Sequence, residues 1–301
     1  MSAIEEIGAA VASVATTAGP SIVTIGRNAR GSGVVIADGQ VLTNAHNLRG
    51  GEVTVTFGNG RSARGTVTGV DPDGDLAVVS VDTTGASAIE WGAGDGLAVG
   101  SPVFGIAASF GGGVRVTFGL VSSVSRSFRG PGGRRIAGSV EHTAPLAPGS
   151  SGGAIVDAAG KFVGLNTNRI GEGFYLALPA DAALRGRVEA LGKGESVERP
   201  RLGVAIAPNH VARRLRRSVG LPERDGILVR GVEEGSAAAA AGIAVGDLIV
   251  SAGGRAIADA DDLQDALGTL KLPFDVVIVR GADEKTVTVS GAKQQRTPGD
   301  A

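Results

Sequence analysis

Short hydrophobic runs separated by glycine, aspartate and asparagine dominate the chain between residues 21 and 179. The runs are rich in β-branched residues and have the length of single strands. They lie at residues 21–25, 33–36, 53–57, 76–81, 114–124, 161–166 and 174–178. Short strands at this spacing, bounded by turn residues, predict an all-β sandwich or a pair of barrels.

Helical patterns flank this region on both sides. An alanine-rich segment, residues 7–18, predicts a short amphipathic helix that ends before Gly19 and Pro20. Small apolar and charged residues mix over residues 180–191 and predict a second helix. The stretch 193–200, which contains glycine, charged residues and a proline, is typical of a linker.

Beyond the linker the pattern changes to a mixture of helices and strands. Helices are expected at residues 211–219, 237–241 and 261–267, and strands at 226–229, 247–250 and, closing the domain, 276–279. The predicted organisation is an N-terminal helical segment (1–20), a mainly β domain (21–192), the linker (193–200), an α+β domain (201–292) and a disordered polar tail (293–301).

Composition limits the classes of function. The 301 residues are 43% hydrophobic with a net charge of -1, which indicates globular domains without a nucleic-acid partner or an anionic membrane surface. The absence of cysteine excludes disulfides, a thiol nucleophile and thiolate metal sites. His142 and His210 lack an accompanying cluster of carboxylates, so we expect them to be structural and expect no metal or cofactor.

Neither a membrane span nor a secretory signal is expected from the sequence. No uninterrupted apolar stretch of about 20 residues occurs, so no membrane span is expected. Glu5 and Glu6 stand where a secretory signal would carry positive charge. These features predict a cytoplasmic location, with a periplasmic or other extracytoplasmic location as the alternative.

Three residues stand in sequence contexts that suit nucleophilic catalysis. A serine hydroxyl needs a neighbouring base, and that base needs a partner that fixes its tautomer. His46 follows a short strand, Asp75 precedes a buried run, and Ser151 lies among glycines that permit the tight turn needed to aim amides at an oxyanion. Asp71 and Asp73 are rivals for the role of Asp75.

These contexts resemble those of the HtrA (Deg) family of chymotrypsin-like serine proteases, whose members carry a PDZ domain. Further likeness lies in residues 97–103, 117–122, 164–167 and 177–179. The resemblance implies two six-stranded β-barrels with the active site between them. It also implies that Ser151 attacks the peptide carbonyl, His46 transfers the proton and Asp75 orients His46. The amides of Gly149, Ser150 and Ser151 would form the oxyanion hole.

Departures from the family pattern surround the nucleophile. Ser150 replaces the usual asparagine, and residues 142–146 replace a segment that normally reads Thr-Asp-Ala-Ala. Pro145 in that segment removes an amide donor. The specificity pocket is expected to be lined by Leu146, Leu165 and Phe174 and to favour small or medium aliphatic side chains. Arg169 falls near a position that is often apolar.

The second domain resembles an HtrA-type PDZ domain. Its carboxylate-binding loop would be Arg201-Leu202-Gly203-Val204, followed by a strand, residues 204–207, that pairs with a bound peptide. The order of Gly-Ser, short helix, Ala-Gly and Gly-Asp-Leu-Ile over residues 235–249 supports the resemblance. The apolar groove wall would consist of Leu263, Ala266 and Leu267. The alternative is an α+β domain whose glycine turns are purely structural.

Together these features predict an ATP-independent serine endopeptidase of protein quality control that cleaves unfolded proteins and recognises peptide C-termini. The alternative is a peptide-binding chaperone or scaffold whose proteolytic site is silent. The resemblance also implies a homotrimer. Because the first 21 residues contain no aromatic side chain, the trimer contacts are expected to be aliphatic, from Ile4, Ile7 and Val11.

Overall fold

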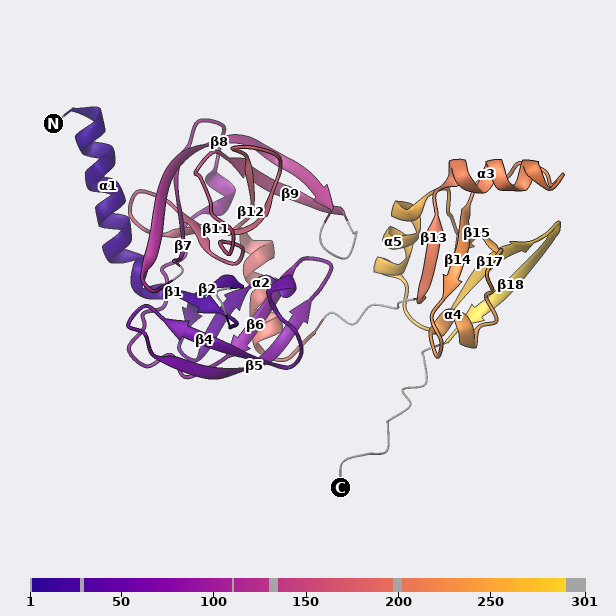
Figure 1. Cartoon of the computed structure of the whole chain (residues 1–301), viewed down its shortest axis with the longest axis horizontal. Coiled ribbons are helices and arrows are strands. Elements are labelled where there is room, and N and C mark those ends of the chain that lie inside the picture. The colour runs from indigo at the N-terminus through magenta and orange to yellow at the C-terminus, as the bar shows by residue number, and fades with distance from the viewer. Residues whose placement is uncertain (1, 28–29, 110, 130–134, 197–201, 291–301) are drawn as a thin grey trace, which may run out of the picture. The chain divides into compact units, whose positions relative to one another are not determined.

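The computed structural model describes residues 2–27, 30–109, 111–129, 135–196 and 202–290 (Figure 1). The chain divides into two compact units, residues 1–197 and 198–301. No helix in the described ranges is long and apolar enough to cross a membrane. The expected tail lies outside the described residues, as do Arg201 and part of the expected linker.

Helix α1 (Ala3–Thr17) begins four residues before the expected start at residue 7. Ser2 caps it: the Ser2 hydroxyl accepts a hydrogen bond from the Glu5 amide, and the Glu5 carboxylate accepts one from the Ser2 amide. This reciprocal capping box satisfies two amides that the first turn leaves without partners. The buried Val14 anchors the helix, which is followed by the turn η1 (Gly19–Ser21).

The first six strands close into a barrel in the order β1-β2-β3-β6-β5-β4. Their bounds are β1 (Ile22–Ile25), β2 (Gly31–Ala37), β3 (Gln40–Thr43), β4 (Glu52–Phe57), β5 (Ser62–Asp71) and β6 (Leu76–Ser80). The turn η2 (Ala45–Asn47) follows β3. Valines and isoleucines that alternate along these strands fill the barrel, as a period of two requires.

The next six strands form a second closed barrel in the order β10-β11-β12-β9-β8-β7. They are β7 (Pro102–Ala108), β8 (Val114–Arg129), β9 (Arg135–His142), β10 (Ala154–Val156), β11 (Phe162–Arg169) and β12 (Tyr175–Pro179), and the turn η3 (Gly94–Gly96) precedes them. Leu42 and Leu76 of the first barrel share one core cluster with Phe104, Phe162 and Leu165 of the second. The barrels are therefore packed against each other, as expected for this fold class.

Helix α2 (Ala182–Gly192) closes the first unit and packs on β5 and β6. Asp181 caps it by accepting a hydrogen bond from the Leu184 amide at 2.7 Å. A side chain at Gly69 of β5 would approach the Leu191 backbone to 2.4 Å. Glycine at this position therefore permits the close approach of the helix to the strand.

The second unit is a sheet in the order β13-β14-β15-β17-β18, with β16 paired to β15. Its strands are β13 (Val204–Ala207), β14 (Ile227–Val232), β15 (Leu248–Ala252), β16 (Arg255–Ala256), β17 (Phe274–Arg280) and β18 (Asp283–Val289), and its helices are α3 (Asn209–Ser218), α4 (Ala237–Ala240) and α5 (Ala260–Thr269). The expectation that residues 276–279 close the domain is wrong, because β18 follows β17 in a hairpin. β18 was missed because most of its residues are polar and exposed.

Candidate active site

His46 and Asp75 form a hydrogen-bonded pair at the junction of the two barrels. The Nδ1 atom of His46, in η2, lies 2.9 Å from both carboxylate oxygens of Asp75, and its backbone N–H donates to Oδ1 at 3.1 Å. Asp75 is buried at the turn between β5 and β6, whereas the His46 side chain is 31% exposed. Since the carboxylate accepts a proton held on Nδ1, Nε2 is the ring nitrogen left to act as a base.

The backbone at this turn shows why Asp75, and not Asp71, meets His46. Asp75 adopts a positive φ of 54°, unusual for a residue other than glycine, and Asn44 donates to its carbonyl oxygen at 3.0 Å. Asp71 accepts instead from the Gly74 amide and pairs with Arg187 at 3.6 Å. The carboxylate that faces His46 is therefore that of Asp75.

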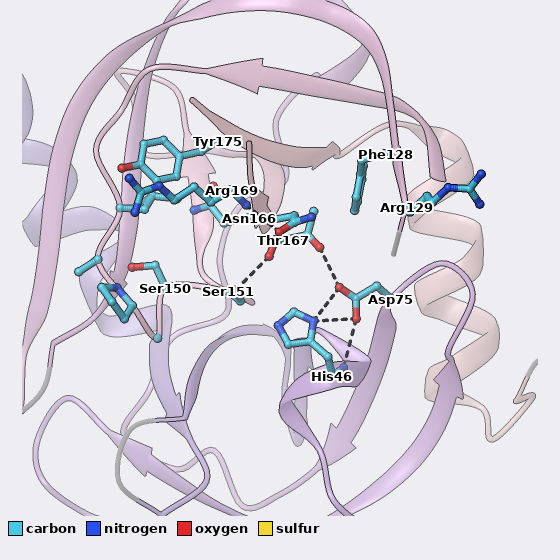
Figure 2. A pocket seen from close by; sticks show the side chains of 15 residues that line it. His46, Asp75, Phe128, Arg129, Ser150, Ser151, Asn166, Thr167, Arg169 and Tyr175 are labelled. Atoms are coloured by element: carbon cyan, nitrogen blue, oxygen red, sulfur yellow. Dashed lines mark hydrogen bonds and ion pairs between the residues drawn. The ribbon is translucent and has the colours of Figure 1, made fainter. Parts of the chain in front are cut away.

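Thr167 connects the carboxylate to the nucleophile candidate. Its hydroxyl donates to Oδ2 of Asp75 at 2.8 Å, and its backbone carbonyl accepts a hydrogen bond from the Ser151 hydroxyl at 3.0 Å. Figure 2 shows Thr167 between the other two residues, with dashed lines to both. The Ser151 hydroxyl thus donates to Thr167 and not to His46, so a rotation of its side chain must precede proton transfer to His46.

The loop before Ser151 is a tight turn in which one of the three expected oxyanion donors is already hydrogen-bonded. Ser150 donates its backbone N–H to the Ala147 carbonyl at 3.1 Å, and Gly149 has a φ of 86°. Proline followed by a glycine with positive φ is typical of a type II turn. The expectation for Ser150 therefore fails, whereas the amides of Gly149 and Ser151 donate to no described residue.

Residues of the first barrel hold this loop in place. The carbonyl of Ser151 accepts from the Ser32 amide at 2.8 Å and from Nδ2 of Asn47 at 2.9 Å, and the Ser32 hydroxyl donates to the Gly149 carbonyl at 2.9 Å. A side chain at Gly152 would approach the Ser32 carbonyl to 2.2 Å. The signals in the sequence for these supporting residues were local: Ser32 lies in the run that leads to His46, and Asn47 directly follows His46.

A cavity of about 480 Å³ opens beside the triad candidates. Leu146 and Arg169 line it, as expected for a specificity pocket. Leu165 does not, because its side chain is fully buried in the core shared by the barrels. Phe174 is 43% exposed and lies outside the lining. Asn166, within the segment 164–167 that resembles the family's substrate-pocket loop, does line it, together with two residues that the sequence did not indicate, Phe128 and Tyr175 (Figure 2).

Asn166, which lines this cavity, forms a buried polar pair with His142. His142 is completely buried, its Nε2 lies 3.1 Å from Oδ1 of Asn166, and its ring stacks on Tyr175 at 5.8 Å. Burial lowers the pKa of His142 to about 4, against the opposing effect of the hydrogen bond that its ring N–H donates to Asn166. His142 is therefore neutral at pH 7, and its Nδ1 has no described partner.

The second unit brings together the residues expected to form a peptide groove. β13 is an edge of the described sheet, so one side of this strand is open to pairing. The carbonyls of Leu202 and Gly203 accept from Ala238 and Glu233, while the Leu202 and Gly203 amides donate to no described residue. Leu263, Ala266 and Leu267 of α5 share a cluster with Val204 and Ile206 of β13; Leu263 and Ala266 are already buried in it, and Leu267 is partly exposed.

The described part of the chain offers no group of three His, Cys, Asp or Glu side chains that could hold a metal ion. The groups that meet at the junction of the barrels are a serine, a histidine and a carboxylate, beside two amides that donate to no described residue.

Each of the two units matches a known protein family. Residues 31–165, which include His46, Asp75 and Ser151, match the model of the trypsin-like peptidase domain, and residues 228–280 match that of the PDZ domain. The fold and site thus define a trypsin-like peptidase joined to a PDZ domain. HhoA of Synechocystis sp., named a serine protease, is 34% identical over 89% of this chain and 72% of its own. The chain belongs to the HtrA family of serine proteases.

Other relatives and solved structures support this assignment. HhoB of Synechocystis sp. is 33% identical over 86% of this chain, and a DegP-like periplasmic serine endoprotease of Halomonas elongata is 30% identical over 88%. The HtrA-type protease AlgW with a decapeptide has a TM-score of 0.67 at 26% identity and covers 93% of this chain and 97% of its own. The chain spans 65% of the length of HhoB and 56% of that of the Halomonas protein.

Proposed function

We propose that this chain is an ATP-independent serine endopeptidase of protein quality control that cleaves unfolded or misfolded proteins. The observation that carries the proposal is the convergence of His46, Asp75 and Ser151 on one cavity beside two unoccupied amides. Relatives of this chain in the HtrA family are named serine endoproteases, which supports the same activity.

In the proposed mechanism, Ser151 first turns from the Thr167 carbonyl towards Nε2 of His46. His46 accepts the hydroxyl proton as the oxygen attacks the peptide carbonyl, and Asp75 stabilises the imidazolium that forms. The amides of Gly149 and Ser151 donate to the developing oxyanion. One such donor lowers the barrier by about 3 kcal/mol, so two donors from a tight turn are sufficient for a working oxyanion hole.

Incubation of the full chain with unfolded casein tests the proposal. The wild-type protein should cleave casein without ATP, whereas Ser151→Ala, which removes only the nucleophilic oxygen, should not. Equal cleavage by both proteins would refute the role of Ser151. Absence of cleavage by the wild type would favour the alternative, a silent peptide-binding chaperone or scaffold.

The second unit is proposed to bind peptide C-termini. A peptide strand would pair with the open edge of β13, and its carboxylate would accept hydrogen bonds from the Leu202 and Gly203 amides, which have no described partner. A peptide with a free C-terminal carboxylate should bind more tightly than the same peptide with an amidated end. Equal affinities in fluorescence anisotropy would contradict this mode of binding.

Assembly and location follow as further parts of the proposal. Ile4 is 82% exposed and Ile7 is 38% exposed on α1, which favours them as contacts in a homotrimer, whereas Val11 packs against the core of its own unit. Light scattering should give a mass of three times 29.8 kDa, and the double substitution Ile4→Ser with Ile7→Ser should lower this mass.

The names of the DegP-like relatives, which call them periplasmic, favour an extracytoplasmic location over a cytoplasmic one. Fractionation of cells decides between the two locations.

A further inference from the structure

A second cavity, of about 610 Å³, lies in the first barrel and is rich in arginine. We call it the arginine cavity. The residues that line it are Gly26, Arg27, Arg30, Asn47, Arg49, Glu52, Val53, Thr54, Ser62, Ala63 and Arg64. Four arginines against one glutamate give this cavity a surplus of three positive charges, although the chain as a whole has a net charge of -1.

Three of these arginines are free to take an outside carboxylate. Arg64 pairs with Glu52, the only acidic side chain in the lining. Arg27, Arg30 and Arg49 are exposed and pair with no carboxylate among the described residues. The arginines of α3 differ, because two of them form ion pairs with neighbouring acids. The surplus charge is thus unneutralised within the described part of the barrel.

One residue that lines the arginine cavity, Asn47, contacts the backbone of the candidate nucleophile. Its side chain donates to the Ser151 carbonyl at 2.9 Å, and Asn47 directly follows His46 in η2. In a serine protease the histidine gives its proton to the leaving amine, so the part of the substrate released as an amine passes beside that histidine. Here His46 belongs to the first barrel, and Arg49, three residues further along the chain, lines the arginine cavity. Most of the lining of the cavity beside the triad comes from the second barrel.

We propose that the arginine cavity binds acidic side chains on the amine side of the scissile bond, and so selects peptide segments with Asp or Glu after the cleavage point. The proposal rests on the endopeptidase activity proposed above. Guanidinium groups bind carboxylates through paired, charge-assisted hydrogen bonds. Each exposed pair changes affinity by only about two- to five-fold, so the preference depends on several arginines acting together and weakens with salt.

Two internally quenched peptides test the preference. They share the sequence before the cleaved bond and differ after it, one with three acidic residues and the other with their amides. The wild type should cleave the acidic peptide with a kcat/KM about ten-fold higher, chiefly through KM. Arg30→Gln with Arg49→Gln should reduce this ratio towards one. Arg115→Gln, which changes an exposed arginine of the second barrel outside the cavity, should keep the ratio.

A wild-type ratio near one, or a ratio that the double variant leaves unchanged, would overturn the inference while leaving the endopeptidase proposal intact. If the wild type cleaves neither peptide, a direct binding measurement tests the inference independently of cleavage. A fluorescent acidic peptide with an amidated C-terminus, which the PDZ carboxylate loop should not hold, is titrated into Ser151→Ala. The added double substitution should weaken binding at least about five-fold, and Arg115→Gln should not. Equal binding in all three proteins, or tighter binding of an oligonucleotide of equal charge, would overturn the inference.

Discussion

Lowering the pH from about 7 to 4 should destabilise the first unit by protonating His142. The ring is completely buried, and only Nε2 has a described partner, the Asn166 side chain. Protonation would place a charge and an additional N–H donor at Nδ1, where no described group accepts it. A buried charge without full hydrogen bonding is unfavourable, so the folded state resists this protonation.

The size of the effect follows from the pKa of His142 in the two states. Burial lowers this pKa from 6.5 to about 4 in the folded protein. Because each unit corresponds to 1.36 kcal/mol, full protonation costs about 3 kcal/mol of the free energy of unfolding. The folded pKa lies below the unfolded one, so this stability is fully present above pH 6.5. It is lost progressively as the pH falls, and the loss is nearly complete at about pH 4.

Urea unfolding followed by tryptophan fluorescence measures this loss in the first unit alone. The only tryptophan of the chain, Trp91, packs edge-on against Phe162 at 5.0 Å, so its emission reports that unit. His142→Gln is the control, because glutamine retains an N–H donor for Asn166 but does not titrate. Between pH 7 and 4 the wild type should lose about 3 kcal/mol more than the variant. Equal losses would refute the reasoning.

Three further substitutions test individual contacts. Thr167→Val removes the hydrogen bond to Asp75. Because hydrogen bonds to charged groups contribute about 1.5–3 kcal/mol, kcat/KM should fall roughly ten- to hundred-fold with little change in KM. Unchanged kinetics would contradict a role for this hydrogen bond. Gly152→Ala places a methyl group 2.2 Å from the Ser32 carbonyl at a φ of 83°, so reaction with a fluorophosphonate should be lost while circular dichroism stays native. Asp247→Ala removes a buried carboxylate that pairs with an arginine and should destabilise the second unit by about 2 kcal/mol, measured by hydrogen exchange; unchanged protection of its strands would count against this contact.

The fold was predictable where hydrophobic residues alone mark the strands. The runs at residues 33–36 and 53–57 lie within observed strands, and the barrel pair follows from them. β5 was missed because glycine, threonine and arginine interrupt its pattern, and the three residues of β10 are too few to show any period. Polar β18 was missed because it lies at the edge of its sheet, where exposed positions need no hydrophobic residues.

The candidate site was predictable to the extent that local motifs mark it. The contexts of His46 and Ser151 are local, but the lining of the cavity depends on how β11 pairs with β12. That pairing shifts register between Asn166 and Asn168, which interrupts the alternation of side chains. Leu165 therefore enters the core while Thr167 reaches Asp75, and no periodicity in the sequence indicates this outcome.

The most direct test of the central claim is the site at which a fluorophosphonate reacts with the full chain, located by mass spectrometry. If His46 and Asp75 activate Ser151 as proposed, the wild type should be labelled on Ser151. His46→Ala should react far more slowly, and Ser151→Ala should stay unmodified. Labelling at another serine, or an equal rate in the His46 variant, would contradict the assignment of this triad.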